Sequence, residues 1–379
     1  MIDVGVVETQ ILELPNPLPL DCGRALRGVE IAYETYGELN SSRDNAVLIC
    51  HALTGDAHAA GLSADPDAPS AGEVEARALG WWDSMIGPGR AFDTDRWFVI
   101  ATNLIGGCRG STGPSSIDPD TGRPYGSGFP PLTVADLVRA QKAFLDELGI
   151  GTLVAVSGAS LGGMQALQFA VDHPALVGGV VAIAATARLD TQGVAMNAIA
   201  RNAITSDPDW QGGDYYGTGR TPRTGMALAR QVGHLTYLSK QSMREKFGRT
   251  LAGEAGEPSL IEPYFAVESY LRYQGAKFVD RFDANSYLVF SRALTLFDLP
   301  PGAFAAARAR FLLISFTSDW IYPPSDSDEL AGALQANGRE VEHVTLDTTY
   351  GHDSFLLEDA LQAPHIRRFL AETYREARR

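Results

Sequence analysis

Several features that would assign a chain to a specialised class are missing from this sequence of 379 residues. Its three cysteines, Cys22, Cys50 and Cys108, are too few for a disulfide framework and show no metal-ligand spacing, so we expect neither disulfides nor a metal site. The most apolar stretch, residues 175–185, is too short to cross a bilayer, which takes about 20 residues. The N-terminus has no basic start and no apolar run of the secretory kind, which leads us to expect a cytoplasmic protein.

Positive charge is also scarce, because 31 lysines and arginines stand against 46 aspartates and glutamates, which gives a net charge of −15. Such a surface repels the phosphate backbone of nucleic acids, so no nucleic-acid partner is expected. A small anionic substrate is not excluded, because a local cluster of arginine or lysine can bind one inside an acidic protein. With 45% apolar and 20% charged residues, the composition is typical of a globular chain with a sizeable core.

Strand and helix patterns alternate along most of the chain. Alternating or continuous apolar runs predict strands, and apolar residues at helical spacing predict helices. The expected strands are residues 28–36, 45–50, 96–102, 153–156, 176–184, 311–316 and 341–346, and the expected helices are 133–148, 161–172, 326–335 and 354–375. This alternation predicts an α/β fold with helices flanking a mostly parallel central sheet.

The alternation is interrupted once, in residues 187–300, which show helical stretches and loops without a clear buried strand. We therefore predict one α/β core built from residues 1–186 and 301–379, with residues 187–300 as a helical insertion that covers it as a lid. Residues 55–72 and 105–131 are rich in loop-forming residues and are predicted to be irregular.

A nucleophile motif lies between a predicted strand and a predicted helix. Residues 158–162 read Gly-Ala-Ser-Leu-Gly, which matches G-x-S-x-G. In the α/β-hydrolase fold this motif holds its serine, here Ser160, in a strained turn above the sheet, and the glycines avoid clashes there. The motif alone also arises by chance as a surface turn, but the flanking strand and helix favour a nucleophile. The pattern therefore predicts an α/β-hydrolase fold.

The partners of such a serine follow it in the order acid, then histidine, each in a loop after a later strand. Asp319 and His352 occupy these two positions. We predict that neutral His352 takes the proton of Ser160 and that Asp319 orients the imidazole. The oxyanion is predicted to be bound by the backbone N–H groups of Leu161 and of Leu53, which lies in the turn after an early strand.

Four other residues compete for these roles. His343 lies within a predicted strand and His365 within the terminal helix, so neither has the exposed loop position that a catalytic histidine needs. Asp326 and Asp328 lie at the start of a predicted helix, and we interpret them as capping residues.

Longer segments carry a resemblance that runs from around residue 8 to the terminal helix. They are His-Ala-Leu-Thr-Gly at 51–55, Asn-Leu-Ile-Gly-Gly-Cys-Arg-Gly-Ser-Thr-Gly-Pro at 103–114, Gly-Ala-Ser-Leu-Gly-Gly-Met-Gln-Ala at 158–166, Ser-Asp at 318–319 and Tyr-Gly-His-Asp at 350–353. On these segments the chain closely resembles the homoserine O-acetyltransferases. The run at 103–114 is far more specific than the serine motif alone. Ala159 stands where many members have Gly, and this small-for-small change leaves the serine turn intact.

The resemblance implies an acyl transfer of methionine biosynthesis that proceeds in two halves. Ser160 would take the acetyl group from acetyl-CoA, CoA would leave, and the hydroxyl of L-homoserine would attack the acyl-enzyme, with His352 as the base in both halves. It also implies acetyl-CoA as a cosubstrate, no bound cofactor, and a homodimer with the insertion as its interface. Because water would hydrolyse an acyl-serine, we expect the lid to shield Ser160 from solvent.

The resemblance further implies that Arg230, in the insertion, binds the amino-acid carboxylate, a task that suits a guanidinium group. Tyr237 lies seven residues later, two helical turns away, so the two side chains are expected to share one face of a helix. From spacing alone, Arg230 would be one of many surface arginines. Asp353 either pairs with the substrate ammonium group or caps the helix that starts near Ser354.

Three other functions stay open on the sequence. An esterase or thioesterase would use the same three residues, and homoserine-dependent release of CoA separates it from a transferase. A relative that takes succinyl-CoA, or serine in place of homoserine, would differ at one or two pocket residues that the sequence does not identify. A non-catalytic binding protein on the same fold is disfavoured, because all three triad residues are present in order.

Overall fold

The computed structural model describes residues 4–65, 78–253 and 260–378 and is built around an eight-stranded sheet in the order β16-β15-β14-β13-β6-β10-β5-β2. The strands are β2 (Gln10–Glu13), β5 (Glu30–Tyr36), β6 (Ala46–Cys50), β10 (Phe98–Thr102), β13 (Leu153–Ala159), β14 (Val177–Ile183), β15 (Arg310–Phe316) and β16 (Val341–Leu346). All neighbours from β16 to β10 pair in parallel, while β5 is antiparallel to both β10 and β2. The predicted mostly parallel α/β sheet is therefore confirmed.

Helices cover both faces of this sheet. Strands β6 and β13 are buried at every residue, as a parallel strand enclosed on two sides requires. In β15, Phe311 and Leu313 join an apolar cluster that includes residues of three helices on one face, whereas Leu312 and Ile314 join a second cluster that includes residues of a fourth helix on the other. The three helices are α1 (Val134–Glu147), α2 (Leu161–Asp172) and α8 (Pro324–Ala336), and the fourth is α10 (Asp359–Ala377).

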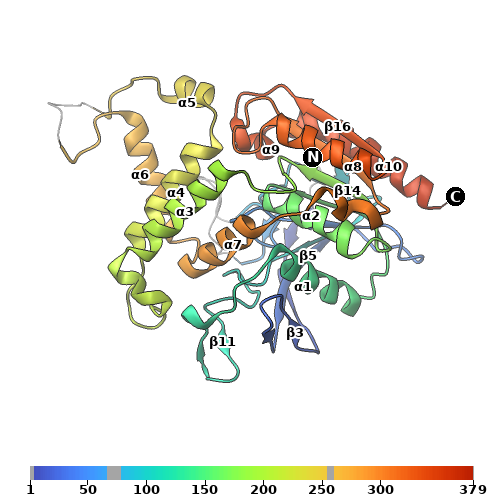
Figure 1. Cartoon of the computed structure of the whole chain (residues 1–379), viewed down its shortest axis with the longest axis horizontal. Coiled ribbons are helices and arrows are strands. Elements are labelled where there is room, and N and C mark those ends of the chain that lie inside the picture. The colour runs from blue at the N-terminus through green and yellow to red at the C-terminus, as the bar shows by residue number, and fades with distance from the viewer. Residues whose placement is uncertain (1–3, 66–77, 254–259, 379) are drawn as a thin grey trace.

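Residues 187–300 form a helical layer that extends to one side of the sheet (Figure 1). Its helices are α3 (Thr191–Thr205), α4 (Arg223–Tyr237), α5 (Lys240–Phe247), α6 (Ala266–Val279) and α7 (Ala284–Leu296), with a 3₁₀ helix at Pro208–Gly213. The described part of this segment adds no strand to the central sheet. Arg188 and Asp298 form an isolated bridge, so the chain leaves the core and returns to it at neighbouring points.

Shorter elements occupy the loops. Four two-stranded pairs join β1 (Val6–Val7) with β7 (Leu62–Ser63), β3 (Leu18–Pro19) with β4 (Ala25–Leu26), β8 (Ile86–Gly87) with β9 (Phe92–Asp93), and β11 (Ile117–Asp118) with β12 (Arg123–Pro124). Further 3₁₀ helices are η1 (Gly126–Gly128), η3 (Pro301–Ala306) and η4 (Gly351–Asp353). The predicted irregular stretch 105–131 thus holds β11, β12 and η1 but no α-helix. Among the helices that the structure describes, none combines the length and apolarity needed to span a membrane.

The prediction of a single C-terminal helix at 354–375 is wrong. The structure has two helices there, α9 (Ser354–Leu357) and α10, separated at Glu358. The backbone of Glu358 is not helical, with φ −108° and ψ 47°. Trp82 Nε1 donates a hydrogen bond to the carbonyl of Phe355 at 3.1 Å, and the Gln362 amide donates to carbonyls of the same turn. These contacts satisfy carbonyls at a helix end, and one of them comes from a residue far away in the sequence.

Candidate active site

Ser160 occupies the tight turn between β13 and α2. Its φ of 55° and ψ of −123° are strained for a residue with a side chain. A Cβ atom on Gly162 would lie 2.1 Å from the carbonyl oxygen of Cys50, and one on Gly158 would lie 2.6 Å from the same oxygen. Both motif glycines are therefore required by the close packing of the turn against the end of β6.

His352 and Asp319 are brought together by the loops after β16 and β15. His352 Nδ1 lies 2.8 Å from Asp319 Oδ2, and both side chains are buried. The other oxygen, Oδ1, accepts hydrogen bonds from the N–H groups of Ile321 at 3.0 Å and Tyr322 at 3.1 Å. Because the carboxylate is fixed at both oxygens and engages Nδ1, it leaves Nε2 of the imidazole to act as a base.

The pKa of His352 results from opposing effects. Burial disfavours the imidazolium and lowers the pKa, but the charge and hydrogen bond of Asp319, together with the charge of Asp353, outweigh it and raise the pKa above its ordinary 6.5. The rings of Tyr237 and Tyr322 lie 6.0 Å and 5.2 Å from the imidazole. Burial raises the pKa of both phenols, so these neighbours stay neutral.

The rival residues have other partners. His343 lies in β16 and His365 on α10, as predicted. The capping interpretation of Asp326 and Asp328 is wrong, since α8 begins earlier, at Pro324, where the fixed φ of proline suits a helix start. Asp326 lies within the first turn, and Asp328 pairs with His343 at 3.1 Å.

The two predicted oxyanion donors flank Ser160. Leu53 lies just after β6, Leu161 opens α2, and β6 pairs directly with β13. The turn that holds Leu53 is fixed by His51, whose Nδ1 lies 2.7 Å from the carbonyl oxygen of Ala52. Within the described residues, neither Leu53 nor Leu161 donates its N–H to another group, so both are available to a substrate oxygen.

A cavity of about 900 Å³ adjoins Ser160 and is lined by both the core and residues 187–300. Arg230, Tyr237, His352 and Asp353 all line it. The Arg230 guanidinium carbon lies 5.6 Å from the centre of the Tyr237 ring, so the two side chains share one face of α4. Sequence spacing thus predicted their proximity correctly.

Asp353 precedes α9, but its side chain makes no capping hydrogen bond there. Burial raises the pKa of this carboxyl group, while the charges of His352 and Arg230 oppose that effect without cancelling it. Asp353 lines the large cavity together with His352 and Arg230. A cationic ligand group in this cavity would stabilise the ionised form of the Asp353 carboxyl group.

The helical insertion packs closely against the loop that carries His352. A Cβ on Gly351, whose φ is 72°, would lie 2.6 Å from both the Tyr237 carbonyl oxygen and the Ser239 nitrogen. Trp320 Nε1 donates a hydrogen bond to the Leu238 carbonyl at 3.4 Å. The C-terminal end of α4 is thereby fixed against the loops of both Asp319 and His352.

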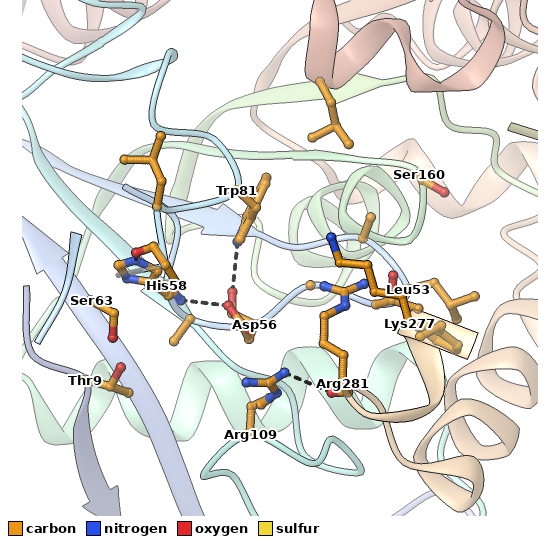
Figure 2. A pocket seen from close by; sticks show the side chains of 18 of the residues that line it. Thr9, Leu53, Asp56, His58, Ser63, Trp81, Arg109, Ser160, Lys277 and Arg281 are labelled. Carbon is orange, nitrogen blue, oxygen red and sulfur yellow. Dashed lines mark hydrogen bonds between the residues drawn. The ribbon is translucent and has the colours of Figure 1, made fainter. Parts of the chain in front are cut away.

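Sequence reasoning missed four residues of this site. Arg109, Lys277 and Arg281 line the same large cavity as Arg230 (Figure 2). Tyr322 lines a second cavity of about 60 Å³ together with Ser160 and His352. Only Arg109 had a signal in the sequence, because it lies within the specific run at 103–114.

Comparison with known proteins identifies similar chains over nearly the whole length. A family model described as the alpha/beta hydrolase fold matches residues 45–359. A homoserine O-succinyltransferase of Alkalilimnicola ehrlichii is 49% identical over 98% of this chain and 97% of its own length. A homoserine O-acetyltransferase of Methanosphaerula palustris is 50% identical over 98% of this chain and 74% of its own length.

Solved structures are similar in the same way. The homoserine O-acetyltransferase from Bacillus anthracis superposes with a TM-score of 0.88 at 28% identity, covering 96% of this chain and 98% of that one. Esterase E22 superposes with a TM-score of 0.86 at 31% identity, covering 96% of this chain and all of its own.

Replacing Gly162 with alanine tests the packing of the serine turn. Because the new Cβ would meet the Cys50 carbonyl, the backbone must shift, and we expect Gly162→Ala to lose about 1–3 kcal/mol of unfolding free energy. Urea unfolding followed by circular dichroism measures this. Gly332→Ala is the matched control, since its Cβ meets no atom within 4 Å on α8, and it should gain about 0.5–1 kcal/mol. An unchanged midpoint for Gly162→Ala would refute the packing argument.

Proposed function

Because this chain belongs to the α/β-hydrolase family and, within it, to the homoserine O-acyltransferases, we propose that it is a homoserine O-acetyltransferase of methionine biosynthesis. It transfers the acetyl group of acetyl-CoA to the hydroxyl of L-homoserine. The observation that carries this proposal is the surroundings of Ser160, which is only 7% exposed and adjoins both a large charged cavity and a small one that contains no lysine or arginine among the described residues.

The reaction uses the triad twice. Ser160 Oγ attacks the thioester carbonyl while His352 Nε2 takes its proton, and the collapsing intermediate expels CoA, whose sulfur receives that proton. In the second half, the homoserine hydroxyl attacks the acetyl-serine carbonyl while His352 takes its proton. When the bond to Ser160 Oγ breaks, His352 returns this proton to Oγ and restores the Ser160 hydroxyl. The N–H groups of Leu53 and Leu161 stabilise the oxyanion in each half.

Homoserine is recognised by the two charged groups beside the triad. The Arg230 guanidinium binds the carboxylate, and the Asp353 carboxylate binds the ammonium group. The contact of Arg230 with Tyr237, and its contact with the Phe278 ring at 4.8 Å, hold the guanidinium in place. Since Asp353 directly follows His352, the amino-acid end of the substrate is fixed relative to the base that must reach its hydroxyl.

The small cavity supports acetyl over succinyl as the transferred group. Its volume of about 60 Å³ suits a methyl group but leaves little room for a longer acyl chain. Its lining is mixed, with apolar side chains (Leu53, Leu294 and Ile321) and neutral polar ones (Asn197 and Thr236). Apart from His352, no basic side chain lines it among the described residues. A succinyl group would place a carboxylate there, and a buried carboxylate without a cationic partner is costly. The named relatives include both acetyltransferases and succinyltransferases, so this pocket is the argument for acetyl.

Esterase activity is the second candidate, because esterase E22 shares the fold over the full length of its chain. The burial of Ser160 beneath the lid favours transfer, since water must be kept from the acetyl-serine until homoserine arrives. The two charged side chains proposed to bind homoserine, Arg230 and Asp353, also favour transfer, because a simple ester needs neither of them.

A homodimer joined through the lid is part of the proposal. Large apolar side chains are exposed on lid helices, among them Leu228 (47%) and Leu235 (55%) on α4 and Ile199 (57%) on α3. Leu228 and Leu235 are seven residues apart and so lie on one helical face. A second copy that covers this face would bury these side chains.

Release of CoA tests the proposed reaction. We expect rapid turnover only with acetyl-CoA and L-homoserine together, slower turnover with succinyl-CoA, and a single release equal to the enzyme concentration when homoserine is omitted. Absorbance of the thioester bond follows the reaction. L-serine serves as the control acceptor. Equal turnover without any amino acid would identify a thioesterase, and preference for succinyl-CoA would refute the pocket argument.

The first half-reaction should depend on the protonation of His352. The imidazole must be neutral to take the Ser160 proton, so the rate should fall as pH decreases through a pKa that lies above 6.5. Omitting homoserine removes any contribution from its ammonium group. The single release of CoA is timed across the neutral range, while circular dichroism verifies that the fold persists. A midpoint at or below 6.5 would contradict the assigned balance of burial and Asp319.

Light scattering tests the dimer. We expect the wild-type chain to have twice the mass of one chain, and Leu235→Arg to yield monomers because it places a charge on the proposed interface. Ile117→Arg is the control, since Ile117 is equally exposed (59%) but lies in the loop pair β11–β12, outside the lid. A monomeric wild-type chain at micromolar concentration would refute the proposal.

A further inference from the structure

The large cavity holds more positive charge than an amino-acid substrate requires. Arg109, Arg230, Lys277 and Arg281 all line it. None of the four forms an ion pair with a carboxylate among residues 4–65, 78–253 and 260–378. Homoserine has one carboxylate, which Arg230 suffices to bind, so three cations have no assigned role.

The arginines among these cations are held by contacts within the cavity wall. Arg109 Nη2 donates a hydrogen bond to the carbonyl oxygen of Arg281 at 2.9 Å. The guanidinium groups of Arg230 and Arg281 both lie over the Phe278 ring, at 4.8 Å and 5.7 Å from its centre. Lys277 lies in the last turn of α6, one helical turn before Arg281. Figure 2 shows Arg109 beside Arg281, with a dashed line for this hydrogen bond, and labels Lys277 among the residues that line the same cavity.

Repulsion among these positive charges raises the free energy of the cavity when no ligand is bound. Burial lowers the pKa of Arg281 to about 10, and the charges of Arg230 and Arg109 contribute to the shift, while Asp56 opposes them. Arg281 still carries its proton at neutral pH, so the repulsion persists in the free protein. An anion bound against the wall would relieve the repulsion and replace the lost hydration.

The size and charge of the cavity indicate which anion binds. A volume of about 900 Å³ far exceeds what homoserine and an acetyl group fill. The thioester must reach Ser160, so the rest of the acyl-CoA has to occupy this cavity or its entrance. Its phosphates would be repelled by a chain of net charge −15 unless a local positive site receives them. Four carboxyl side chains also line the cavity, and they disfavour phosphate where they lie: Glu8, Asp56, Asp65 and Asp353. Of these, Asp56 acts on Arg281, where its charge offsets part of the repulsion from Arg230 and Arg109.

We propose that Arg109, Lys277 and Arg281, next to Arg230, form a phosphate subsite that binds the phosphate groups of the acyl-CoA. The proposal rests on the proposed function for the identity of the donor. The chemistry is that of two guanidinium forks and one ammonium group toward phosphate oxygens. An anion of another source, the homoserine carboxylate, is the competing occupant that the experiment must distinguish.

The test measures binding of CoA and of pantetheine, which lacks the phosphates, by titration calorimetry of the full chain. Arg281→Gln should weaken CoA binding by about tenfold or more, the loss expected for one charge-assisted hydrogen bond, and should leave pantetheine binding unchanged. Arg109→Gln and Lys277→Gln should act in the same direction. Added salt should weaken CoA binding less in these variants than in the wild-type chain. Arg292→Gln, at an exposed position of α7 outside the cavity lining, is the matched control and should bind CoA as the wild type does.

Several outcomes would overturn the subsite. They are an unchanged affinity for CoA in all three variants, an equal loss for CoA and pantetheine, no CoA binding by the wild-type chain, or a rise in the KM for homoserine alone. The last result would mean that Arg109, Lys277 and Arg281 bind the amino-acid carboxylate instead of phosphate. Because binding needs no turnover, the subsite and the proposed function can fail separately. A chain that binds CoA through these residues but acetylates no homoserine would retain the subsite and refute the function.

Discussion

The strained turn at Ser160 is the constraint on which the site depends. A residue with a side chain adopts φ 55° only if its surroundings hold it there, and here the supports are the end of β6 and the two glycines that pack against it. The order of the strands in the sheet then brings the other residues of the site to the same edge. β6, which leads to Leu53, lies on one side of β13, while β14, β15 and β16 follow on the other and lead to Asp319 and His352. Parallel strands end at one edge, so all these loops meet above it.

A second constraint joins this edge to the lid. Gly351 lets the histidine loop approach the end of α4 more closely than a side chain would allow. Arg230, proposed to bind the homoserine carboxylate, therefore lies on a helix that is fixed relative to the base. This accounts for how one fold can serve both esterases and acyltransferases. Under the proposed function, Ser160, His352 and Asp319 would supply the acyl-serine chemistry, and the inner surface of the helical insertion would select whether an alcohol or water completes the reaction.

Much of the core could be predicted, because its strands are continuous apolar runs and the serine motif has a defined strand–turn–helix context. The break at Glu358 could not, since Trp82, which lies far away in the sequence, provides part of the hydrogen bonding around it. The limits at the site are similar. Arg230 was singled out by resemblance, whereas Arg109 and Arg281 are 172 residues apart in the sequence and meet only through tertiary structure. Arg109 lies within the specific run at 103–114, but nothing in the local sequence of Arg281 distinguishes it from other arginines.

The contrast between an acidic exterior and a basic cavity wall has a consequence for catalysis. Cations that repel one another in the free protein gain more from an anionic ligand than solvated surface cations do, because the partly buried site has already lost some hydration. Binding energy from groups far from the thioester can then hold the carbonyl carbon at Ser160 and favour the transition state. A small ester lacks phosphates and would gain none of this energy. Discrimination between acyl-CoA and simple esters would therefore arise at Arg109, Lys277 and Arg281, away from the triad.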